Sequence, residues 1–171
     1  MKTLLSTSAL ALCVALPSAG SAQDVNLSYG ATLTSRYVSS GVAQSSGAAL
    51  QPWVEVDAAG FYAGLWASNT SLAITGGKYE LDVYAGYRNE IGQFSYDVGY
   101  ARYYYYKPYT NCCGEWYVGM GVAATDSLGL GVKFNYDPVA KVTNSKLTVD
   151  YAINDKVGLS AEICKINKGG R

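Results

Sequence analysis

Histidine is absent from this chain of 171 residues, and charged side chains make up only 15% of it. The first absence excludes Ser-His-Asp and Cys-His catalysis and removes the commonest ligand of transition metals. The second is unusual, because a soluble domain typically carries about 25% charged residues. It indicates that much of the outer surface does not face water. With 13 basic and 13 acidic residues, the chain also has no basic excess with which to bind nucleic acid.

Long apolar runs are absent too, apart from Leu4 to Leu16 near the N-terminus. This run is shorter than the roughly 20 residues that a membrane-spanning helix needs. It follows Lys2 and leads into small residues up to Ala22, which is the pattern of a secretory signal peptide. We therefore expect residues 1–22 to be cleaved and residues 23–171 to form one exported domain.

The rest of the sequence consists of segments in which apolar and polar residues alternate. The pattern is clearest from Tyr79 to Tyr106, where two alternating runs are joined by Asn89 to Gln93. Strict alternation predicts strands with two unlike faces. Seven further runs bring the predicted total to nine strands and an all-β chain. These runs are Val25 to Tyr37, Leu50 to Ala58, Phe61 to Ser68, Trp116 to Val122, Leu128 to Asp137, Leu147 to Ile153 and Val157 to Cys164.

The connections between these runs alternate in length. Ala59-Gly60 is short, whereas Asn69 to Lys78, Lys107 to Gly114 and Pro138 to Lys146 are longer. Short periplasmic turns and longer extracellular loops are typical of an up-and-down outer-membrane barrel. The apolar faces carry no charge at their centres, as contact with lipid requires. We therefore predict an antiparallel transmembrane β-barrel of about 8–10 strands in the bacterial outer membrane. Tyrosines near strand ends, including the Tyr103–Tyr106 run, predict aromatic girdles at the two interfaces.

The polar faces of the predicted strands carry nine acidic and three basic residues, which we expect to line a lumen. They are Arg36, Glu55, Asp57, Glu80, Asp82, Arg88, Asp97, Glu115, Lys133, Asp137, Asp150 and Glu162. This balance predicts a porin that passes small polar solutes or ions with a mild preference for cations. The carboxylate pairs Glu55/Asp57 and Glu80/Asp82 would also suit acid–base catalysis or a Ca²⁺ site, but a polar lumen lining accounts for them better. No catalytic, cofactor-binding or metal-binding residue, and no enzyme activity, is predicted.

Two other functions fit the same pattern. A barrel of about eight strands is just filled by its side chains, so a non-conducting structural or adhesive membrane barrel is one alternative. A periplasmic barrel with its apolar face turned inward around a small ligand is the other.

The odd number of strands is a difficulty, since bacterial barrels of this kind have an even number. Two explanations stay open. Either one strand is counted as two in this prediction, or the domain is C-terminally shortened and closes differently or only on oligomerisation.

Three cysteines lie in the predicted mature chain, in an oxidising compartment. We expect Cys112 or Cys113, placed in a long loop, to form a disulfide with Cys164. A vicinal bridge between Cys112 and Cys113 is the alternative. Cys13 would be the acylated residue of a lipoprotein, but Leu12 stands where a small residue is required.

Several blocks of the sequence, in order, resemble the TorF family of porins. The blocks are Ser35 to Ser45, Phe61 to Asn69, Glu80 to Tyr87, Phe94 to Tyr106 and Glu115 to Gly119. The resemblance covers most of the predicted mature chain and implies an outer-membrane β-barrel porin without a defined substrate. The sequence departs from the family pattern at Ser40, where an Arg usually precedes the glycine.

Overall fold

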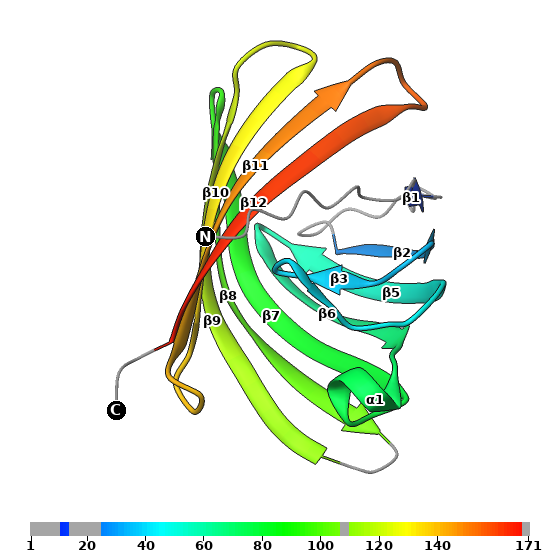
Figure 1. The fold of residues 1–171 in the computed structure, drawn as a ribbon. Helices are drawn as coiled ribbons and strands as arrows, with labels where there is room; N and C mark the ends of the chain where they lie inside the picture. Colours follow the sequence, from blue (N-terminus) through cyan, green and yellow to red (C-terminus); the bar gives the residue numbers. More distant parts are fainter. Residues whose placement is uncertain (1–10, 14–24, 107–109, 169–171) are drawn as a thin grey trace.

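The computed structural model describes residues 11–13, 25–106 and 110–168, and most of them belong to one large antiparallel sheet (Figure 1). Its strands pair in the order β1-β2-β5-β6-β7-β8-β9-β10-β11-β12. They are β1 (Ala11–Cys13), β2 (Asn26–Thr34), β5 (Ala49–Ala58), β6 (Phe61–Asn69), β7 (Tyr79–Ile91), β8 (Phe94–Tyr106), β9 (Thr110–Ala123), β10 (Leu128–Asp137), β11 (Val142–Ala152) and β12 (Gly158–Lys168). Apart from β1, the segment expected to be a signal peptide lies outside the described residues.

The nine strands β2 and β5 to β12 confirm the predicted all-β chain. The central hairpin is the longest, because β7 and β8 pair without interruption from Tyr79↔Tyr106 to Ile91↔Phe94. Its turn is shorter than predicted, since only Gly92 and Gln93 lie between the strands. Each of the nine predicted runs is a separate strand, so the number stays odd and the explanation that one strand is counted as two is wrong.

Two of the predicted long loops prove to be mostly strand. β9 begins at Thr110 and β11 at Val142, so residues 138–141 connect β10 to β11, and residues 107–109 between β8 and β9 lie outside the described residues. We call this end of the sheet the α1 rim, because the β6–β7 connection contains the single-turn helix α1 (Leu72–Thr75). Another connection at this rim contains the small hairpin of β3 (Val38–Ser39) and β4 (Val42–Ala43). The opposite end, where β5 and β6 are joined by Ala59 and Gly60, is the short-turn rim.

The sheet curves strongly, so that it forms a deep trough with a concave and a convex face (Figure 1). Among the described residues, no pairing joins β12 to β2, and β1 occupies the outer edge of β2. The predicted closed barrel is thus present only as an open, curved sheet. In the described part of the chain, no helix is long and apolar enough to cross a membrane.

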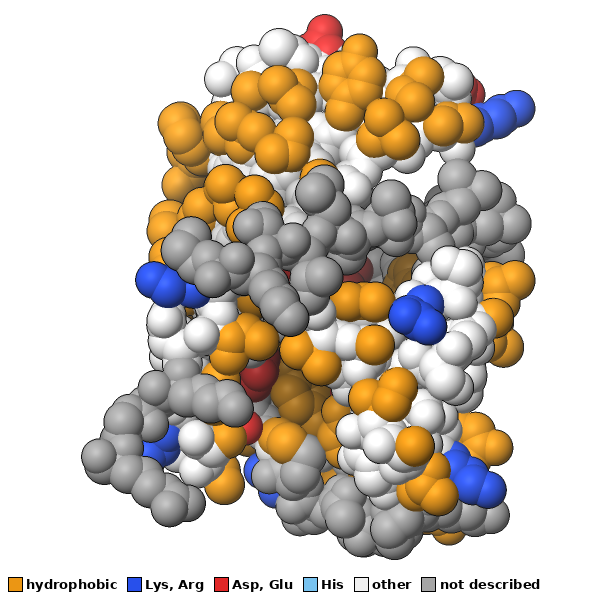
Figure 2. All heavy atoms as spheres, viewed as in Figure 1, with side chains coloured by type: hydrophobic (Ala, Val, Ile, Leu, Met, Phe, Trp, Pro, Cys, Tyr) orange, Lys and Arg blue, Asp and Glu red, His pale blue; other side chains and the backbone are white. Residues whose placement is uncertain are grey.

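Apolar side chains lie mainly on the outside of this trough. Among the described residues, only Ala49, Tyr62, Ala101 and Tyr117 are buried apolar or aromatic side chains. Large apolar side chains on the convex face are exposed instead, and they cover much of the outer surface in Figure 2. They include Leu27, Val56, Phe61, Leu65, Leu81, Val83, Val98, Trp116, Val118, Phe134, Leu147, Val149, Leu159 and Ile163. The predicted division into an apolar and a polar face is present in these strands, with exceptions such as Arg102 of β8, which pairs with Val83 and so lies on the convex face.

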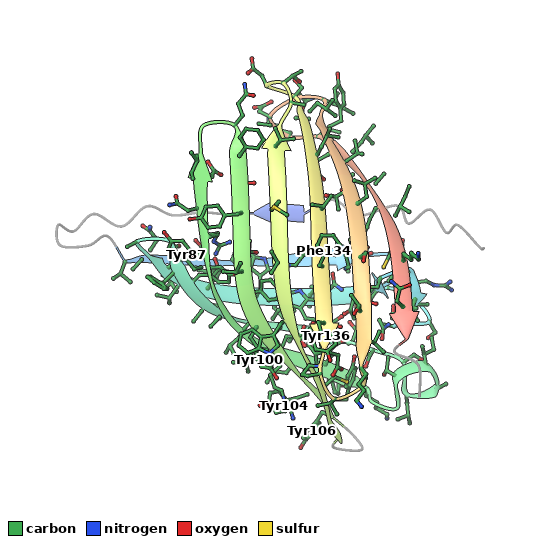
Figure 3. The ribbon with its side chains drawn as sticks, turned by 90° about the vertical axis from the view of Figure 1, so that its left-hand side faces the viewer. Tyr87, Tyr100, Tyr104, Tyr106, Phe134 and Tyr136 are labelled. Carbon is green, nitrogen blue, oxygen red and sulfur yellow. The ribbon has the colours of Figure 1, made fainter. Side chains whose placement is uncertain are left out.

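Tyrosine is divided between the two faces. Figure 3, which looks onto the convex face, shows Tyr104, Tyr106 and Tyr136 toward the ends of β8 and β10 at the α1 rim, whereas Tyr100 lies halfway along β8. The prediction that the whole Tyr103–Tyr106 run lies at the outer interface is wrong for Tyr103 and Tyr105, which bond to carboxylates on the concave face. Period-two geometry must divide any run of four consecutive strand residues equally between the two faces.

Candidate functional site: the charged concave face

Side chains from non-adjacent strands meet only on the side toward which a sheet curves, so their contacts identify the concave face. Arg88 of β7 forms an ion pair with Glu55 of β5, across the intervening strand β6. The Arg88 guanidinium also lies 4.0 Å from the centre of the Tyr62 ring. Directly opposite Arg88 in the β7–β8 ladder is Asp97.

The hydroxyl of Tyr62 links this ion pair to the next strands. It donates a hydrogen bond to the Asp97 carboxylate and lies 2.7 Å from the hydroxyl of Tyr117 on β9. Because the Tyr62 hydroxyl donates its one hydrogen to Asp97, it accepts a hydrogen bond from the Tyr117 hydroxyl. Lys133 of β10 lies 4.1 Å from the centre of the Tyr117 ring. We call Glu55, Arg88, Tyr62, Asp97, Tyr117 and Lys133 the central network.

A second cluster lies on the same face nearer the α1 rim and is centred on Glu115. Its carboxylate accepts hydrogen bonds from the Tyr103 hydroxyl at 3.1 Å, from Asn135 Nδ2 at 2.7 Å and from Asn144 Nδ2 at 3.4 Å. Glu80 accepts one from the Tyr105 hydroxyl at 3.0 Å. With Asp82, these residues line a cavity of about 380 Å³. We call the cluster of Glu80, Asp82, Glu115, Asn135 and Asn144 the acidic pocket.

Tyr37 forms one wall of the acidic pocket from the segment between β2 and β3. Ser45 Oγ accepts a 2.8 Å bond from its backbone N–H, and its ring meets that of Trp66 edge-on at 5.3 Å. Burial, reinforced by the charges of Glu80 and Asp82, raises the pKa of Tyr37. Its hydroxyl therefore remains protonated.

Of the remaining predicted lumen residues, Asp137 lines the cavity of the acidic pocket and the other four lie outside both clusters. Glu162 of β12 pairs with Lys146 of β11 at 3.6 Å. Asp137 is buried and its Oδ1 accepts the backbone N–H groups that follow in the β10–β11 turn, so it has a structural role. Asp57 accepts a bond from Asn26 near the short-turn rim. Asp150 and Arg36 have exposed side chains, and Arg36 lies beyond the end of β2.

The predicted disulfide between Cys164 and Cys112 or Cys113 is not formed. Cys164 is a free thiol on β12, whereas Cys113 is disulfide-bonded. The prediction placed Cys112 and Cys113 in a loop, but both belong to β9, and β10 and β11 lie between that strand and β12. A bridge from β9 to β12 would have to span these two strands.

The predicted lumen lining left out polar residues of the concave face, among them Asn135, Asn144 and Lys146. A signal was available for Asn135, which is two positions from Lys133 and therefore on the same face. The other two fell in a stretch that was predicted to be a loop. Their places became visible only through the β10–β11 register, which sets Asn135 opposite Asn144 and Lys133 opposite Lys146.

The chemistry available on this face is electrostatic binding. In the described part of the chain, no group of three or more His, Cys, Asp or Glu side chains is placed to hold a metal ion. Carboxylates, tyrosine hydroxyls and amides instead cover the concave face from β5 to β12. Such a surface can attract and orient small cationic or polar solutes.

Comparison with known proteins identifies the family of the chain. The model of a family described as "Bacterial protein of unknown function (Gcw_chp)" matches residues 18–162. No curated protein and no solved structure matches the chain.

Proposed function

We propose that this chain, which belongs to the bacterial family Gcw_chp of unknown function, is an outer-membrane β-barrel that acts as a small porin with a preference for cations. The observation that carries the proposal is that apolar and polar side chains are placed the opposite way from those of a water-soluble protein. Large apolar side chains are exposed along the convex face, whereas most of the buried described side chains are polar. Apolar surface is unfavourable in water by roughly 25 cal/mol per Å², but this cost is absent in lipid.

The spacing of aromatic residues supports contact with a bilayer. Tyr96 and Tyr104 lie on the convex side of β8, eight positions apart, or about 26 Å along the strand. Tyr87 lies beside Tyr96, with a 6.1 Å distance between ring centres, and Phe61 lies beside Tyr87 at 4.8 Å. Aromatic girdles flank an apolar band about 25 Å tall in outer-membrane barrels. The two groups of rings therefore fit the two membrane interfaces.

The orientation follows from the connections and from the expected export signal. We propose that the short-turn rim faces the periplasm and the α1 rim faces the exterior. The resemblance of the sequence blocks to the TorF porins supports the same arrangement. Outer-membrane lipid would then be the partner of the convex face.

Closure of the sheet is a part of the proposal. Unpaired edges of β2 and β12 in hydrocarbon would cost several kcal/mol for each backbone group. We propose that β12 pairs with β2 on insertion, once cleavage of residues 1–22 has removed β1 from that edge. Because nine strands alternate in direction, β2 and β12 run the same way and the closing seam is parallel.

The charge of the concave face accounts for the preference for cations. Acidic residues outnumber basic ones in the predicted lining, even when Lys146 is added to Arg88 and Lys133. Excess fixed negative charge attracts cations and excludes anions from a narrow polar passage. The solutes would be ions or small polar molecules.

A non-conducting membrane barrel is the second candidate, and one observation favours it. The central network places two tyrosine rings, an arginine and a lysine side by side on the concave face. In a barrel of this size such side chains can fill the interior. The periplasmic ligand-binding barrel is less favoured, because its apolar face would have to be the concave one.

Cell fractionation followed by planar-bilayer recording tests the proposal. We expect the mature protein in the outer-membrane fraction, with a gel mobility that changes on boiling, and discrete channel currents that reverse at the potential of a cation-preferring pore. A protein recovered in the periplasm would contradict the membrane assignment. A folded outer-membrane protein without conductance would support the second candidate.

A further inference from the structure

The acidic pocket holds four buried oxygen atoms that accept no hydrogen bond from any residue the structure describes. They are Glu80 Oε2, Asp82 Oδ1, Asn135 Oδ1 and Asn144 Oδ1. Glu80 is only 4% exposed, and the two asparagines are 9% and 8% exposed. Leaving such groups unpaired is costly, by roughly 1–3 kcal/mol each and more when they are charged. All four are acceptors, so the missing partner is a donor or a cation.

The charged groups of the pocket also indicate that the missing partner is a cation. Four carboxylates, Glu80, Asp82, Glu115 and Asp137, line the cavity, and Lys146 is the one basic residue among its described lining. Lys146 already pairs with Glu162 at 3.6 Å. Glu115 is satisfied by its three donors, whereas Glu80 has one unpaired oxygen and Asp82 Oδ1 has no partner. Neither Glu80 nor Asp82 therefore has a basic partner among the described side chains.

The geometry favours an organic cation over a metal ion. No three carboxylates of the described residues are arranged to hold a metal, and the cavity of about 380 Å³ is far larger than a bare ion. That volume lies in the range of small-molecule sites. Three tyrosine rings, those of Tyr37, Tyr103 and Tyr105, form part of its wall and can face a positive group.

We propose that the acidic pocket is a binding site for a small organic cation that carries several N–H donors on ammonium or guanidinium groups. Its N–H groups supply partners for the unpaired oxygens of Glu80, Asp82 and the two asparagines. Its positive charge offsets the carboxylates, and its carbon chain lies against the tyrosine rings. The site goes beyond the proposed conduction, because binding in the pocket does not require a continuous pore.

Isothermal titration calorimetry on the purified full-length mature protein in detergent, at low ionic strength, tests the site. The probe is agmatine, which has an ammonium at one end and a guanidinium at the other. Calcium chloride and uncharged 1,4-butanediol are titrated in parallel. We expect saturable binding of agmatine to one site, with neither comparison compound binding there. Conductance is not measured, so the result is independent of whether the protein forms a pore.

Two conservative variants locate the site. Glu80→Gln and Asp82→Asn each remove one negative charge without changing side-chain size, and each should weaken agmatine binding by about tenfold or more, the equivalent of one charge-assisted hydrogen bond. Asp150→Asn makes the same change on the exposed end of β11 and should leave the affinity unchanged.

Three results would overturn the proposal. They are the absence of agmatine binding to the unmodified protein, saturable binding of calcium in its place, and agmatine affinity unaltered in both pocket variants. Heat-modifiable gel mobility shows whether each variant is folded. Loss of folding in the variants would leave the measurement on the unmodified protein as the decisive one.

Discussion

Glycines on the concave face make room for tyrosines of neighbouring strands. A Cβ atom on Gly99 would lie 2.5 Å from the Tyr117 hydroxyl, and one on Gly86 would lie 2.5 Å from the carbonyl oxygen of Val98 and 2.6 Å from the Tyr62 ring. Side-chain carbons do not approach other atoms so closely in folded proteins. The glycine-rich character of the polar face thus reflects a crowded interior, in which each small residue supports a large one.

Gly86→Ala should therefore destabilise the protein by about 1–3 kcal/mol, because the added methyl group displaces Tyr62 or the backbone of β8. Gly129→Ala is the matched control on the same face, since its Cβ would be 3.8 Å from its nearest neighbour, Asp150. The control should be neutral or slightly stabilising. Urea unfolding of the two variants in lipid vesicles measures the difference, and equal stabilities would show that the concave face is not tightly packed.

The Tyr62 hydroxyl is the centre of the central network. Tyr62→Phe should destabilise the protein by about 1–3 kcal/mol, because it leaves both the Asp97 carboxylate and the Tyr117 hydroxyl without their partner. Tyr79→Phe removes the hydroxyl of an exposed tyrosine on the convex face and should change stability far less. The same unfolding assay applies. A loss no larger than that of the control would mean that the network does not stabilise the sheet.

The strands themselves were predictable from the sequence, and the reason is physical. Each strand has one face in an apolar and one in a polar environment, so apolar and polar residues alternate along it. For Leu128–Asp137 the predicted and observed bounds agree. Near the α1 rim this signal fades. Thr143 to Lys146 contains only polar residues and was read as a loop, although backbone pairing with β10 and β12 continues through it. Hydropathy records the environment of side chains and not the pairing of the backbone.

The site was predictable to a smaller extent. Alternation placed Glu80, Asp82 and Glu115 on one face, but it could not show that they share one cavity or that Asn144 joins them. That proximity depends on the register of β7 to β11 and on the curvature of the sheet. The alternation of β8 also shows that the Tyr103–Tyr106 run must be divided between the two faces. The sequence prediction nevertheless assigned all four tyrosines to one aromatic girdle, because the run is entirely aromatic.

Adjacent positions of β11 should tolerate a new positive charge to very different extents. Val149 lies on the convex face and Thr148 on the concave face. Val149→Arg should lower the free energy of unfolding in lipid by about 2–4 kcal/mol, the cost of a cation facing the bilayer centre. Thr148→Arg, the neighbouring control, should have a much smaller effect. Equal losses for the two variants would contradict the assignment of the faces.

For the molecule as a whole, selectivity depends on the sum of the lining charges. Lys133→Met removes one of the few positive charges from the concave face and should increase the preference for cations, whereas Asp97→Asn should decrease it. Reversal potentials in a salt gradient across a planar bilayer measure both changes. Shifts in the same direction for the two variants would indicate that these residues do not border the conducting path.

The central claim is that the convex face meets lipid and the concave face encloses polar space. Spin labels attached in turn to cysteines at positions 147 to 151 of β11, in a protein whose native cysteines are replaced, report it most directly by their accessibility in lipid vesicles to oxygen and to a water-soluble nickel complex. Oxygen accessibility should peak at positions 147, 149 and 151, and nickel accessibility at 148 and 150. A profile with the two maxima exchanged, or without a period of two, would contradict the proposed membrane barrel.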